Sequence, residues 1–386
     1  MKYINLLGAT GSIGTQVLEV VSSLSDEFTV RAISVGHNSI KAEQIIEKYH
    51  PEYVSFIDKE VAEKFAKKYS NIKFGYGENG LIQCAIYKSN DKDVYVVNAV
   101  VGMIGLKPTI EAIKASKTVL LANKETLVVG GEIIMPLVKQ YKAKLIPIDS
   151  EHSAIMQCLE GRKNKEISRI IITASGGIFR DKKRAELENV TAEDATHHPN
   201  WAMGKKITVD CATMVNKALE VMEAHYLFNC SYDKITALIH RQSIIHSAVE
   251  FVDGVIMAQM AKPDMRIPIQ NALTYPDKLP FKLNTRMNLE DIVSLTFETL
   301  DYKKYPCFKM GLDCAKMGGI MPTVYNASNE IANSLFLSNK IKYLDIENII
   351  KIAIEEYKDK NLHDFKLDDI IRIDNEVREF VRKRIK

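Results

Sequence analysis

Residues 3–14 of the chain read Tyr-Ile-Asn-Leu-Leu-Gly-Ala-Thr-Gly-Ser-Ile-Gly. An apolar run leads into three glycines, Gly8, Gly11 and Gly14, and a helical pattern follows whose apolar residues share one face. A strand, a glycine-rich turn and a helix in this order are typical of sites where backbone N–H groups approach a pyrophosphate. The pattern therefore favours dinucleotide binding over the alternative, an ordinary tight turn between a strand and a helix.

The alternation of strand and helix continues to residue 149. Short β-branched runs predict six strands, which are Tyr3–Leu7, Thr29–Val35, Tyr53–Ile57, Val94–Val101, Thr118–Ala122 and Leu145–Ile148. Repeated units of this kind form parallel sheets with right-handed crossovers. We therefore expect an α/β protein in which residues 1–148 form a Rossmann-like, dinucleotide-binding domain.

The pattern changes after Asp149. Polar and glycine-rich loops at residues 174–180 and 197–206 interrupt strands such as Arg169–Thr173 and Ile235–Ile239. This texture predicts a central α+β catalytic domain over residues 149–275.

Prolines and then helical patterns mark the rest of the chain. Pro276, Pro280 and Pro306 indicate a connector over residues 276–310, because each proline removes a backbone donor and stiffens the chain. Amphipathic segments after it predict a helical domain over residues 311–386.

Composition excludes several classes of protein. The 386 residues, 46% hydrophobic and 26% charged, are enough for two or three domains with sizeable cores. A net charge of +3 is too small for a nucleic-acid binder that neutralises phosphates, and no apolar stretch is long enough to span a membrane. The six cysteines show no metal-binding or disulfide spacing, so we expect a cytoplasmic protein in a reducing compartment.

The second strand bears on which dinucleotide binds. NAD sites place an acidic residue at its end, whereas this chain has Gly36, His37, Asn38 and Ser39 there and no acid. A 2′-phosphate is tolerated at such an end, so the sequence favours NADPH. The alternative for His37 is a solvated loop side chain.

Two segments offer carboxylates. Asp149-Ser150-Glu151 follows the sixth strand, and on an extended chain Asp149 and Glu151 point to the same side and suit magnesium or manganese. In a helix, Asn216, Lys217 and Glu220 share one face and could bind a phosphate, a hydroxyl and a metal. The alternatives are a solvated turn for the first segment and a surface-stabilising Lys–Glu pair for the second.

Two loops carry further polar groups. Ser175-Gly176-Gly177 follows a strand and offers N–H groups and a hydroxyl to an anion. The segment around Trp201, the only tryptophan, indicates either an active-site lid or a buried aromatic anchor.

Several motifs occur together and in order. They are GATGSIG (8–14), LLANKE (120–125), DSEHSAI (149–155), ASGG (174–177), HHPNWAMGKKI (197–207), NKALE (216–220), IHRQSIIHS (239–247), KPDMRIPI (262–269) and YPC (305–307). With them the chain resembles the 1-deoxy-D-xylulose 5-phosphate reductoisomerase family over nearly its whole length.

The resemblance implies roles for these residues. The implied NADPH site consists of Thr10, Gly11, Ser12, Ile13, Gly36, His37, Asn38, Asn123, Glu125 and Gly204. The implied ligands of a divalent metal, Mn²⁺, Mg²⁺ or Co²⁺, are Asp149, Glu151 and Glu220. The implied substrate contacts are Lys124, Ser150, Glu151, Ser175, His198, Cys211, Asn216, Lys217 and Glu220. Lys124, Glu151 and His198 are the implied catalytic residues, with the choice of base between Lys124 and Glu151 open, and Trp201 and Met203 sit on a lid at about residues 195–206.

Two positions depart from the family's usual pattern. His37 stands where a lysine is common, so we expect the 2′-phosphate to be bound more weakly and with a stronger dependence on pH. Cys211 stands where a serine usually donates to the substrate phosphate, and a thiol is a poor donor.

The resemblance implies a reaction in two stages. A ketose phosphate, 1-deoxy-D-xylulose 5-phosphate, undergoes a metal-assisted skeletal rearrangement, and hydride transfer from NADPH then gives 2-C-methyl-D-erythritol 4-phosphate in the non-mevalonate isoprenoid precursor pathway. A homodimer is expected, with a sugar phosphate as substrate and neither nucleic acid nor membrane as partner. Two alternatives are a metal-independent NADPH-dependent aldehyde dehydrogenase and a dinucleotide sensor without catalysis.

Overall fold

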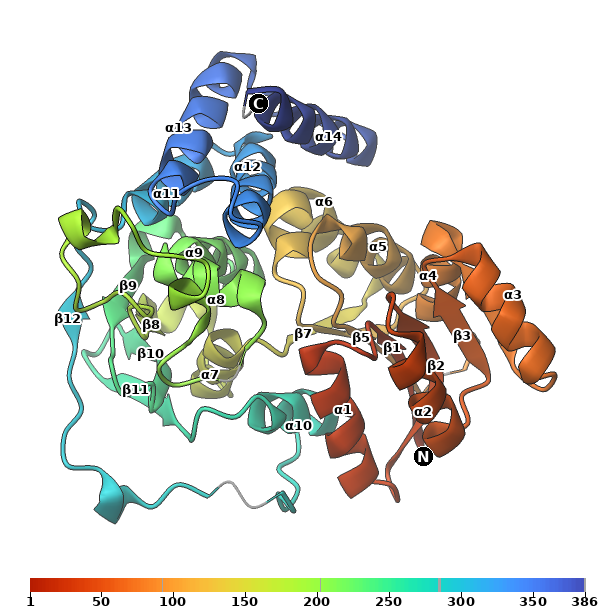
Figure 1. The fold of residues 1–386 in the computed structure, drawn as a ribbon. Coiled ribbons are helices and arrows are strands. Elements are labelled where there is room, and N and C mark those ends of the chain that lie inside the picture. Colours follow the sequence, from red (N-terminus) through yellow and green to blue (C-terminus); the bar gives the residue numbers. More distant parts are fainter. Residues whose placement is uncertain (92, 202, 284–285, 385–386) are drawn as a thin grey trace. The chain divides into compact units, whose positions relative to one another are not determined.

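The computed structural model describes residues 1–91, 93–201, 203–283 and 286–384 (Figure 1). The chain divides into two compact units. The first unit comprises Met1–Thr126, Ile134–Ser153 and Asp264–Thr285, and the second comprises Leu127–Ile133, Ala154–Pro263 and Arg286–Lys386. Within the described ranges, no helix has the length and apolarity needed to cross a bilayer.

A seven-stranded parallel sheet is the framework of the first unit, in the order β4-β3-β2-β1-β5-β6-β7. Its strands are β1 (Lys2–Leu7), β2 (Phe28–Val35), β3 (Tyr53–Phe56), β4 (Lys73–Tyr76), β5 (Val94–Asn98), β6 (Thr118–Leu121) and β7 (Lys144–Pro147). The strand order reverses direction between β1 and β5, and ligands of such sheets bind at that point, outside the carboxyl ends of the strands. The glycine turn of residues 8–14 follows β1 directly and so lies there.

Helices accompany this sheet. They are α1 (Ser12–Ser23), α2 (Ser39–Tyr49), α3 (Lys59–Lys68), α4 (Gly77–Ala85), α5 (Leu106–Lys114), α6 (Glu125–Tyr141) and α10 (Arg266–Thr274). Helix α1 buries Val17, Leu18 and Val21, as its apolar spacing predicts. Helix α10, far away in the sequence, packs against α1.

A mixed five-stranded sheet is the framework of the second unit, in the order β11-β10-β8-β9-β12. Its strands are β8 (Ile167–Ala174), β9 (Ile235–Ile239), β10 (Ile245–Phe251), β11 (Ile256–Met260) and β12 (Glu298–Thr299). Strands β8 and β9 are parallel, and their last residues, Ala174 and Ile239, are paired. The loops that follow these two strands therefore start side by side.

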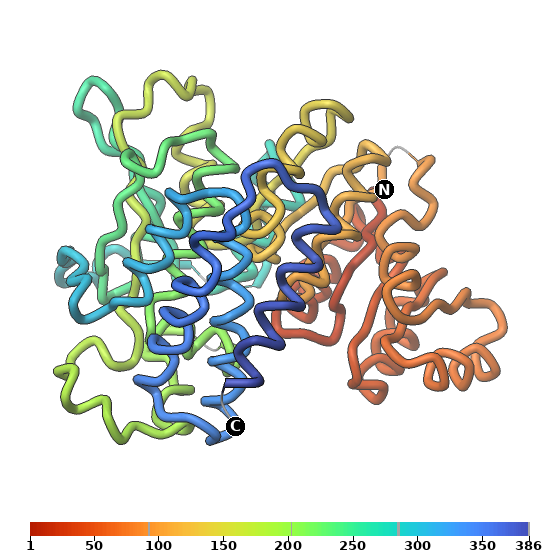
Figure 2. Tube along the Cα trace, turned by 90° about the horizontal axis from the view of Figure 1, so that it is seen from above, coloured from red at the N-terminus to blue at the C-terminus, as the bar shows by residue number. Residues whose placement is uncertain are grey.

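Helices complete the structure. Helices α7 (Ser150–Cys158), α8 (Lys205–Ala212) and α9 (Val215–Phe228) belong to the central part of the chain, and α11 (Pro306–Met317), α12 (Met321–Leu337), α13 (Asp345–Tyr357) and α14 (Leu367–Arg384) to its end. Helix α12 packs against both α13 and α14, which form the blue part of the trace in Figure 2.

The predicted fold class, a parallel Rossmann-like sheet followed by a central α+β part and terminal helices, is confirmed. One strand boundary is wrong: the strand expected to reach Val101 ends at Asn98. The Asn98 amide donates to the Gly105 carbonyl (3.1 Å) and to Thr109 Oγ1 (2.8 Å), and these bonds turn the chain toward α5.

Candidate active site

The glycine turn packs too closely for side chains. Gly8 has φ +83°, and a Cβ built there would lie 2.7 Å from the Ala99 carbonyl oxygen. A Cβ at Gly14 would lie 2.1 Å from the Gly8 carbonyl oxygen. Gly11 is the N-cap of α1 and no side chain caps that end, so the helix N-terminus and its dipole face the turn. This arrangement fits a pyrophosphate.

The end of β2 adds a cation that the sequence analysis missed. His37 is exposed and its Nδ1 lies 3.4 Å from Asp58 Oδ2. Asn38 caps α2, because its Oδ1 accepts a hydrogen bond from the backbone N–H of Lys41 (3.0 Å). The Lys41 ammonium in turn donates to the Thr10 carbonyl (3.2 Å) and so lies beside the glycine turn. The only signal in the sequence was a lysine in the first turn of the second helix.

The turn after β6 joins the sheet to α6. Asn123 is buried, and its amide donates to the carbonyls of Val100 (2.8 Å) and Gly102 (2.9 Å). Its Oδ1 accepts from the Thr126 N–H (3.0 Å). These bonds fix the backbone of the turn that carries Lys124 and Glu125, both of which are buried.

The geometry expected for Asp149 and Glu151 is wrong. Residues 150–158 form α7, so Glu151 lies in the first turn of a helix and not on an extended chain. Asp149 Oδ1 accepts from the Glu151 N–H (3.2 Å), which is the bond of an N-cap aspartate. Helix α7 begins here because Asp149 caps its N-terminus. The sequence analysis assigned the residues before Asp149 to a strand and did not recognise the aspartate as a helix cap.

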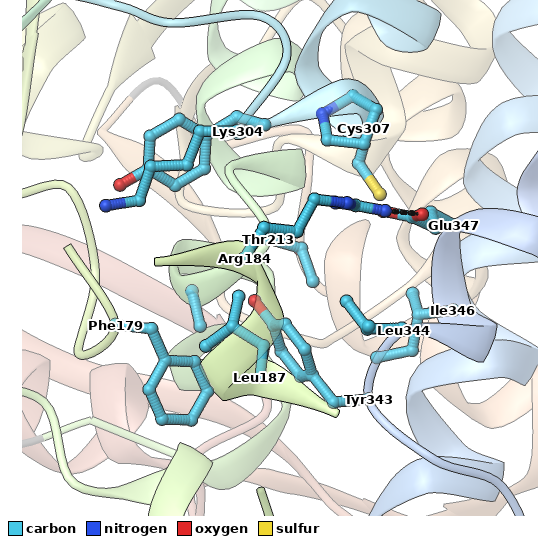
Figure 3. A pocket seen from close by; sticks show the side chains of 13 residues that line it. Phe179, Arg184, Leu187, Thr213, Lys304, Cys307, Tyr343, Leu344, Ile346 and Glu347 are labelled. Atoms are coloured by element: carbon cyan, nitrogen blue, oxygen red, sulfur yellow. Dashed lines mark hydrogen bonds and ion pairs between the residues drawn. The ribbon is translucent and has the colours of Figure 1, made fainter. Parts of the chain in front are cut away.

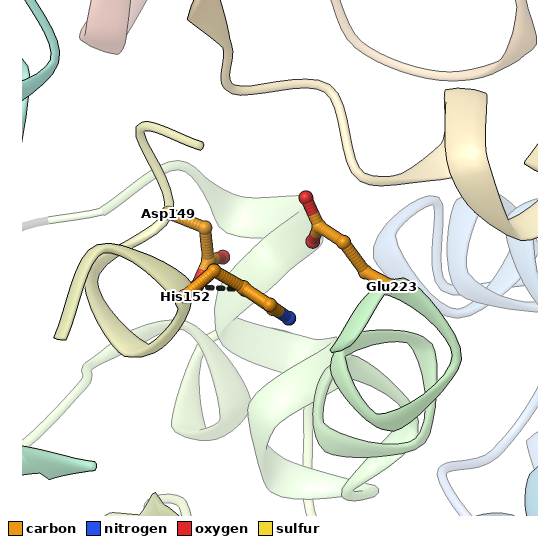
Figure 4. Close-up of side chains that lie close together, drawn as sticks. All are labelled: Asp149, His152 and Glu223. Carbon is orange, nitrogen blue, oxygen red and sulfur yellow. Dashed lines mark hydrogen bonds and ion pairs between the residues drawn. The ribbon is translucent and has the colours of Figure 1, made fainter. Parts of the chain in front are cut away.

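Asp149 is an ionised carboxylate between two donors. The Lys124 ammonium donates to Oδ2 of Asp149 (2.6 Å). Nδ1 of His152 lies 2.9 Å from Oδ1 of Asp149, as Figure 4 shows. Burial alone would raise the pKa of Asp149, but Lys124 and His152 outweigh it and hold the pKa well below its usual value. Because the carboxylate carries no proton, Nδ1 of His152 is the donor. Ser150 donates to the neighbouring Glu151 carboxylate.

Helix α9 holds a second polar group, in the second unit. Asn216 donates to Glu220 Oε1 (2.5 Å), and the Lys217 ammonium donates to Oε2. The three side chains share one face, as predicted, but they are 8%, 4% and 1% exposed, so a solvated surface pair is excluded. Buried charges at this density are typical of ligand sites.

The loops after β8 and within the predicted lid meet at His198. His198 Nδ1 accepts from the N–H groups of Asn200 (3.1 Å) and Trp201 (3.0 Å), so the proton of the neutral ring is on Nε2. Nε2 therefore donates to Ser175 Oγ (2.9 Å). Burial, with the nearby charges of Arg180 and Lys217, lowers the pKa of His198 to about 4.

In the segment predicted to be a lid, the tryptophan contacts a histidine of β10. The rings of Trp201 and His246 are 5.7 Å apart, and Trp201 is only partly buried. Met203 is also partly buried, whereas Gly204, the N-cap of α8, is exposed. Cys211 lies at the end of α8, where its carbonyl oxygen would be 2.7 Å from a Cβ at Gly177. His246 lies in the motif IHRQSIIHS and Arg180 in the loop of residues 174–180, but the sequence assigned neither residue a role.

The structure thus brings the predicted residues into one group in each unit. The first unit assembles Lys124, Asp149, Ser150 and Glu151, with His152 added, and the second assembles Ser175, His198, Asn216, Lys217 and Glu220.

A separate cavity of about 20 Å³ in the second unit is lined by Phe179, Leu187 and Tyr343, among others (Figure 3). Arg184 and Glu347 form an ion pair across its wall. Its volume suits about one water molecule, so it is not a substrate site.

Family models match three segments of the chain. Residues 4–131 match the 1-deoxy-D-xylulose 5-phosphate reductoisomerase model, and residues 145–228 match the C-terminal domain model of the same enzyme. Residues 260–380 match a further DXP reductoisomerase C-terminal domain model.

Relatives that match over their full length are also 1-deoxy-D-xylulose 5-phosphate reductoisomerases. A 1-deoxy-D-xylulose 5-phosphate reductoisomerase of Geobacillus sp. (strain WCH70) is 49% identical over 99% of both chains. That of Halalkalibacterium halodurans is 49% identical over 100% of both.

Solved structures agree. A DOX-P reductoisomerase in complex with NADPH, fosmidomycin and magnesium has a TM-score of 0.93 at 33% identity, covering 100% of this chain and 98% of that one. The reductoisomerase from Zymomonas mobilis in complex with NADPH has a TM-score of 0.91 at 35% identity, covering 100% and 99%. The chain belongs to the 1-deoxy-D-xylulose 5-phosphate reductoisomerase family.

Proposed function

We propose that this chain converts 1-deoxy-D-xylulose 5-phosphate to 2-C-methyl-D-erythritol 4-phosphate, using NADPH and a divalent metal, in the non-mevalonate pathway to isoprenoid precursors. The observation that carries the proposal is the 49% identity to a named reductoisomerase over 99% of both chains. The chemistry of the two polar groups supports it residue by residue.

The cofactor proposal rests on the glycine turn. A side chain at Gly8 or Gly14 would clash with backbone, and the N-terminus of α1 has no side-chain cap, so the turn fits a pyrophosphate. When bound, NADPH supplies the hydride for the reductive stage. The residues that we propose for its site are Thr10, Gly11, Ser12, Ile13, Gly36, His37, Asn38, Asn123, Glu125 and Gly204, with Lys41 added for its position beside Thr10.

We propose that Asp149, Glu151 and Glu220 are ligands of one divalent metal. Asp149 is ionised and Glu220 is 1% exposed, and carboxylate oxygens are the donors that Mg²⁺ and Mn²⁺ prefer. Such a metal supplies positive charge that stabilises developing negative charge on adjacent carbonyl and hydroxyl oxygens of the substrate. These three carboxylates are therefore suitable ligands for Mg²⁺, the metal in the related DOX-P reductoisomerase structure.

The chain's own groups bind and orient the substrate. The Lys124 ammonium is paired with Asp149. In this proposal Lys124 and Glu151 hold or move a proton at the substrate's carbonyl and hydroxyl groups. Ser150 orients the Glu151 carboxylate.

The phosphate end is assigned to the group in the second unit. Ser175, Asn216 and Lys217 supply hydroxyl, amide and ammonium donors, with Cys211 a weaker one. His198 offers its Nε2 proton to the same region, since that proton already points at Ser175 Oγ. Binding energy from this remote phosphate orients the reacting carbons.

The lid, about residues 195–206, would exclude water while Trp201 and Met203 cover the substrate. In this proposal, residues 1–148 bind NADPH, 149–275 carry catalysis, 276–310 connect and 311–386 form the helical domain. We propose that the protein is a homodimer. We also propose a cytoplasmic location, because all six cysteines are free thiols.

The test follows NADPH absorbance in purified protein supplied with 1-deoxy-D-xylulose 5-phosphate. We expect consumption with Mg²⁺ or Mn²⁺, none with chelator, and a loss of roughly 100-fold or more in kcat/KM for Glu220→Gln, because even groups that only support a metal ligand are worth 10–100-fold. Glu188→Gln, an exposed carboxylate of the same unit, is the matched control and should be unchanged.

The same assay separates the alternatives. Turnover that persists in chelator would indicate a metal-independent aldehyde dehydrogenase. Binding of NADPH without consumption under any condition would indicate a sensor, and either result would overturn the proposal.

A further inference from the structure

The segment IHRQS, residues 239–243, has no part in the function proposed above. Its residues 240–243 follow β9 as a turn, directly beside the loop that follows β8, because Ala174 and Ile239, the last residues of the two strands, are paired. Ser243 holds a positive φ of +52°, which is uncommon for a residue other than glycine. Backbone of this kind marks places where surrounding contacts determine the conformation.

The lid docks onto this turn through one side chain. The Asn200 amide donates to the Arg241 carbonyl (2.8 Å) and to Ser243 Oγ (2.7 Å). An asparagine amide has two N–H groups, so both are used on the turn. Asn200 is also next to Trp201, and its backbone N–H helps to fix His198.

The same turn supports the Ser175 loop. Arg180 Nη1 donates to the Arg241 carbonyl (3.1 Å) and to the Ser175 carbonyl (3.0 Å). The Arg241 carbonyl therefore accepts from both the lid and the loop that carries Ser175.

The turn itself is held rigidly. His240 is fully buried, and its Nε2 accepts from the N–H groups of Ile244 (3.2 Å) and Ile245 (3.1 Å). Its Nδ1 therefore donates to the Thr296 carbonyl (2.9 Å). The Arg241 guanidinium pairs with carboxylates on both sides, which belong to Asp181 and Glu298. A platform fixed in this way can position what docks on it.

We propose that Asn200 is a positioning residue, whose amide docks the lid onto the turn of residues 240–243 and so places His198 and Trp201. The role in catalysis rests on the proposed function, because the lid then covers the sugar phosphate. The docking itself does not rest on it, and it is testable without any substrate.

The test uses the fluorescence of Trp201, the only tryptophan of the chain. Asn200→Asp has the same shape, but one oxygen replaces the amide nitrogen that carries both donor N–H groups and faces the Arg241 carbonyl. We expect its tryptophan to be quenched by acrylamide at least about twofold more strongly than in the wild type, in protein without ligands. Gln242→Glu is the matched control: it makes the same amide-to-acid change on the turn itself, but that side chain contacts Thr296 and not the lid.

Ser243→Gly provides a second variant, which tolerates the positive φ and removes the side chain with its hydroxyl acceptor. It should give a smaller increase in quenching than Asn200→Asp. With substrate, Asn200→Asp should raise KM about tenfold or more, consistent with losing two hydrogen bonds, with a smaller change in kcat.

Equal quenching in the wild type and Asn200→Asp, or an equal increase in Gln242→Glu, would overturn the proposal. If the wild type shows no reductoisomerase activity but Asn200→Asp still exposes Trp201, the proposed function has failed and the docking role stands.

Discussion

His198 is a neutral ring held in one tautomer, because two backbone N–H groups point at Nδ1 and Nε2 donates to Ser175. Its pKa is about 4 when the lid is docked, owing to burial and to the charges of Arg180 and Lys217, and returns toward 6.5 when the ring is exposed. His198 therefore binds a proton more tightly when the lid is open. The free energy that favours the docked lid is largest above about pH 6.5 and decreases as the pH falls toward 4.

We expect acrylamide quenching of Trp201 to be constant between pH 7 and 8 and to increase between pH 6.5 and 4. His198→Asn keeps an acceptor for the two N–H groups but does not titrate, so its quenching should change much less with pH than in the wild type. His246, which touches Trp201 and whose pKa burial also lowers to about 4, remains in that variant. An unchanged pH response in His198→Asn would assign the effect to His246 and contradict the account.

Cys211 offers a weaker donor than a hydroxyl at a position assigned to the substrate phosphate. Cys211→Ser should lower KM for the sugar phosphate about fivefold, since a neutral hydrogen bond contributes about 1 kcal/mol. Cys211→Ala should match the wild type within about twofold, because little is lost with the thiol. Equal KM values for the serine and alanine variants would show that this side chain does not contact the phosphate.

For single residues, the sequence predicted which side chains lie together more reliably than it predicted their backbone geometry and burial. The helical spacing of Asn216 and Glu220 was enough to place them on one face, whereas their burial depended on tertiary packing that no local pattern reports. The extended geometry for Asp149 and Glu151 was wrong, because an aspartate after a strand also reads as a helix cap. Asn200 was missed, since its partners lie about 40 residues away in the sequence.

Helix α8, which follows the lid, is anchored by buried amides of α12. Asp210 Oδ1 accepts from Asn329 (2.9 Å) and Asn333 (2.8 Å), and Asn333 also donates to the Lys206 carbonyl (2.9 Å). Asn333→Ala should cost about 2–3 kcal/mol in the free energy of unfolding, the value for hydrogen bonds to a buried charge.

The midpoint of urea unfolding, followed by circular dichroism, measures this cost. Ser334→Ala is the matched control, because the next residue of the same helix is exposed and should change stability by less than about 0.5 kcal/mol. Equal midpoints for the two variants would show that α12 does not anchor α8.

Elements with a clear hydrophobic pattern were predicted from the sequence, and short elements were not. The strands of the parallel sheet are continuous apolar runs, as expected for strands buried on both faces, and five of the six predicted strands match within about two residues. Strand β4 (Lys73–Tyr76) was missed, because it lies at the sheet edge and has no buried residue. Strand β12 has two residues, and no sequence period exists over that length.

At the scale of the whole molecule, one edge of the second unit remains uncovered in the described chain. Strand β11 is an edge strand, and Val255, Ile256 and Met257 are exposed there. Exposed apolar edge strands pair with other chains, which agrees with the proposed homodimer. Light scattering should give the mass of two chains, and Ile256→Lys should shift it toward one. A wild-type mass of one chain would contradict the proposal.

The proposal that Asp149, Glu151 and Glu220 are ligands of one divalent metal can be tested by equilibrium binding of Mn²⁺ to the purified protein, independently of turnover. We expect one Mn²⁺ to bind per chain. Its affinity should be at least about tenfold lower in Asp149→Asn and in Glu220→Gln, and unchanged in Glu188→Gln. Wild-type affinity in either Asp149→Asn or Glu220→Gln would contradict it.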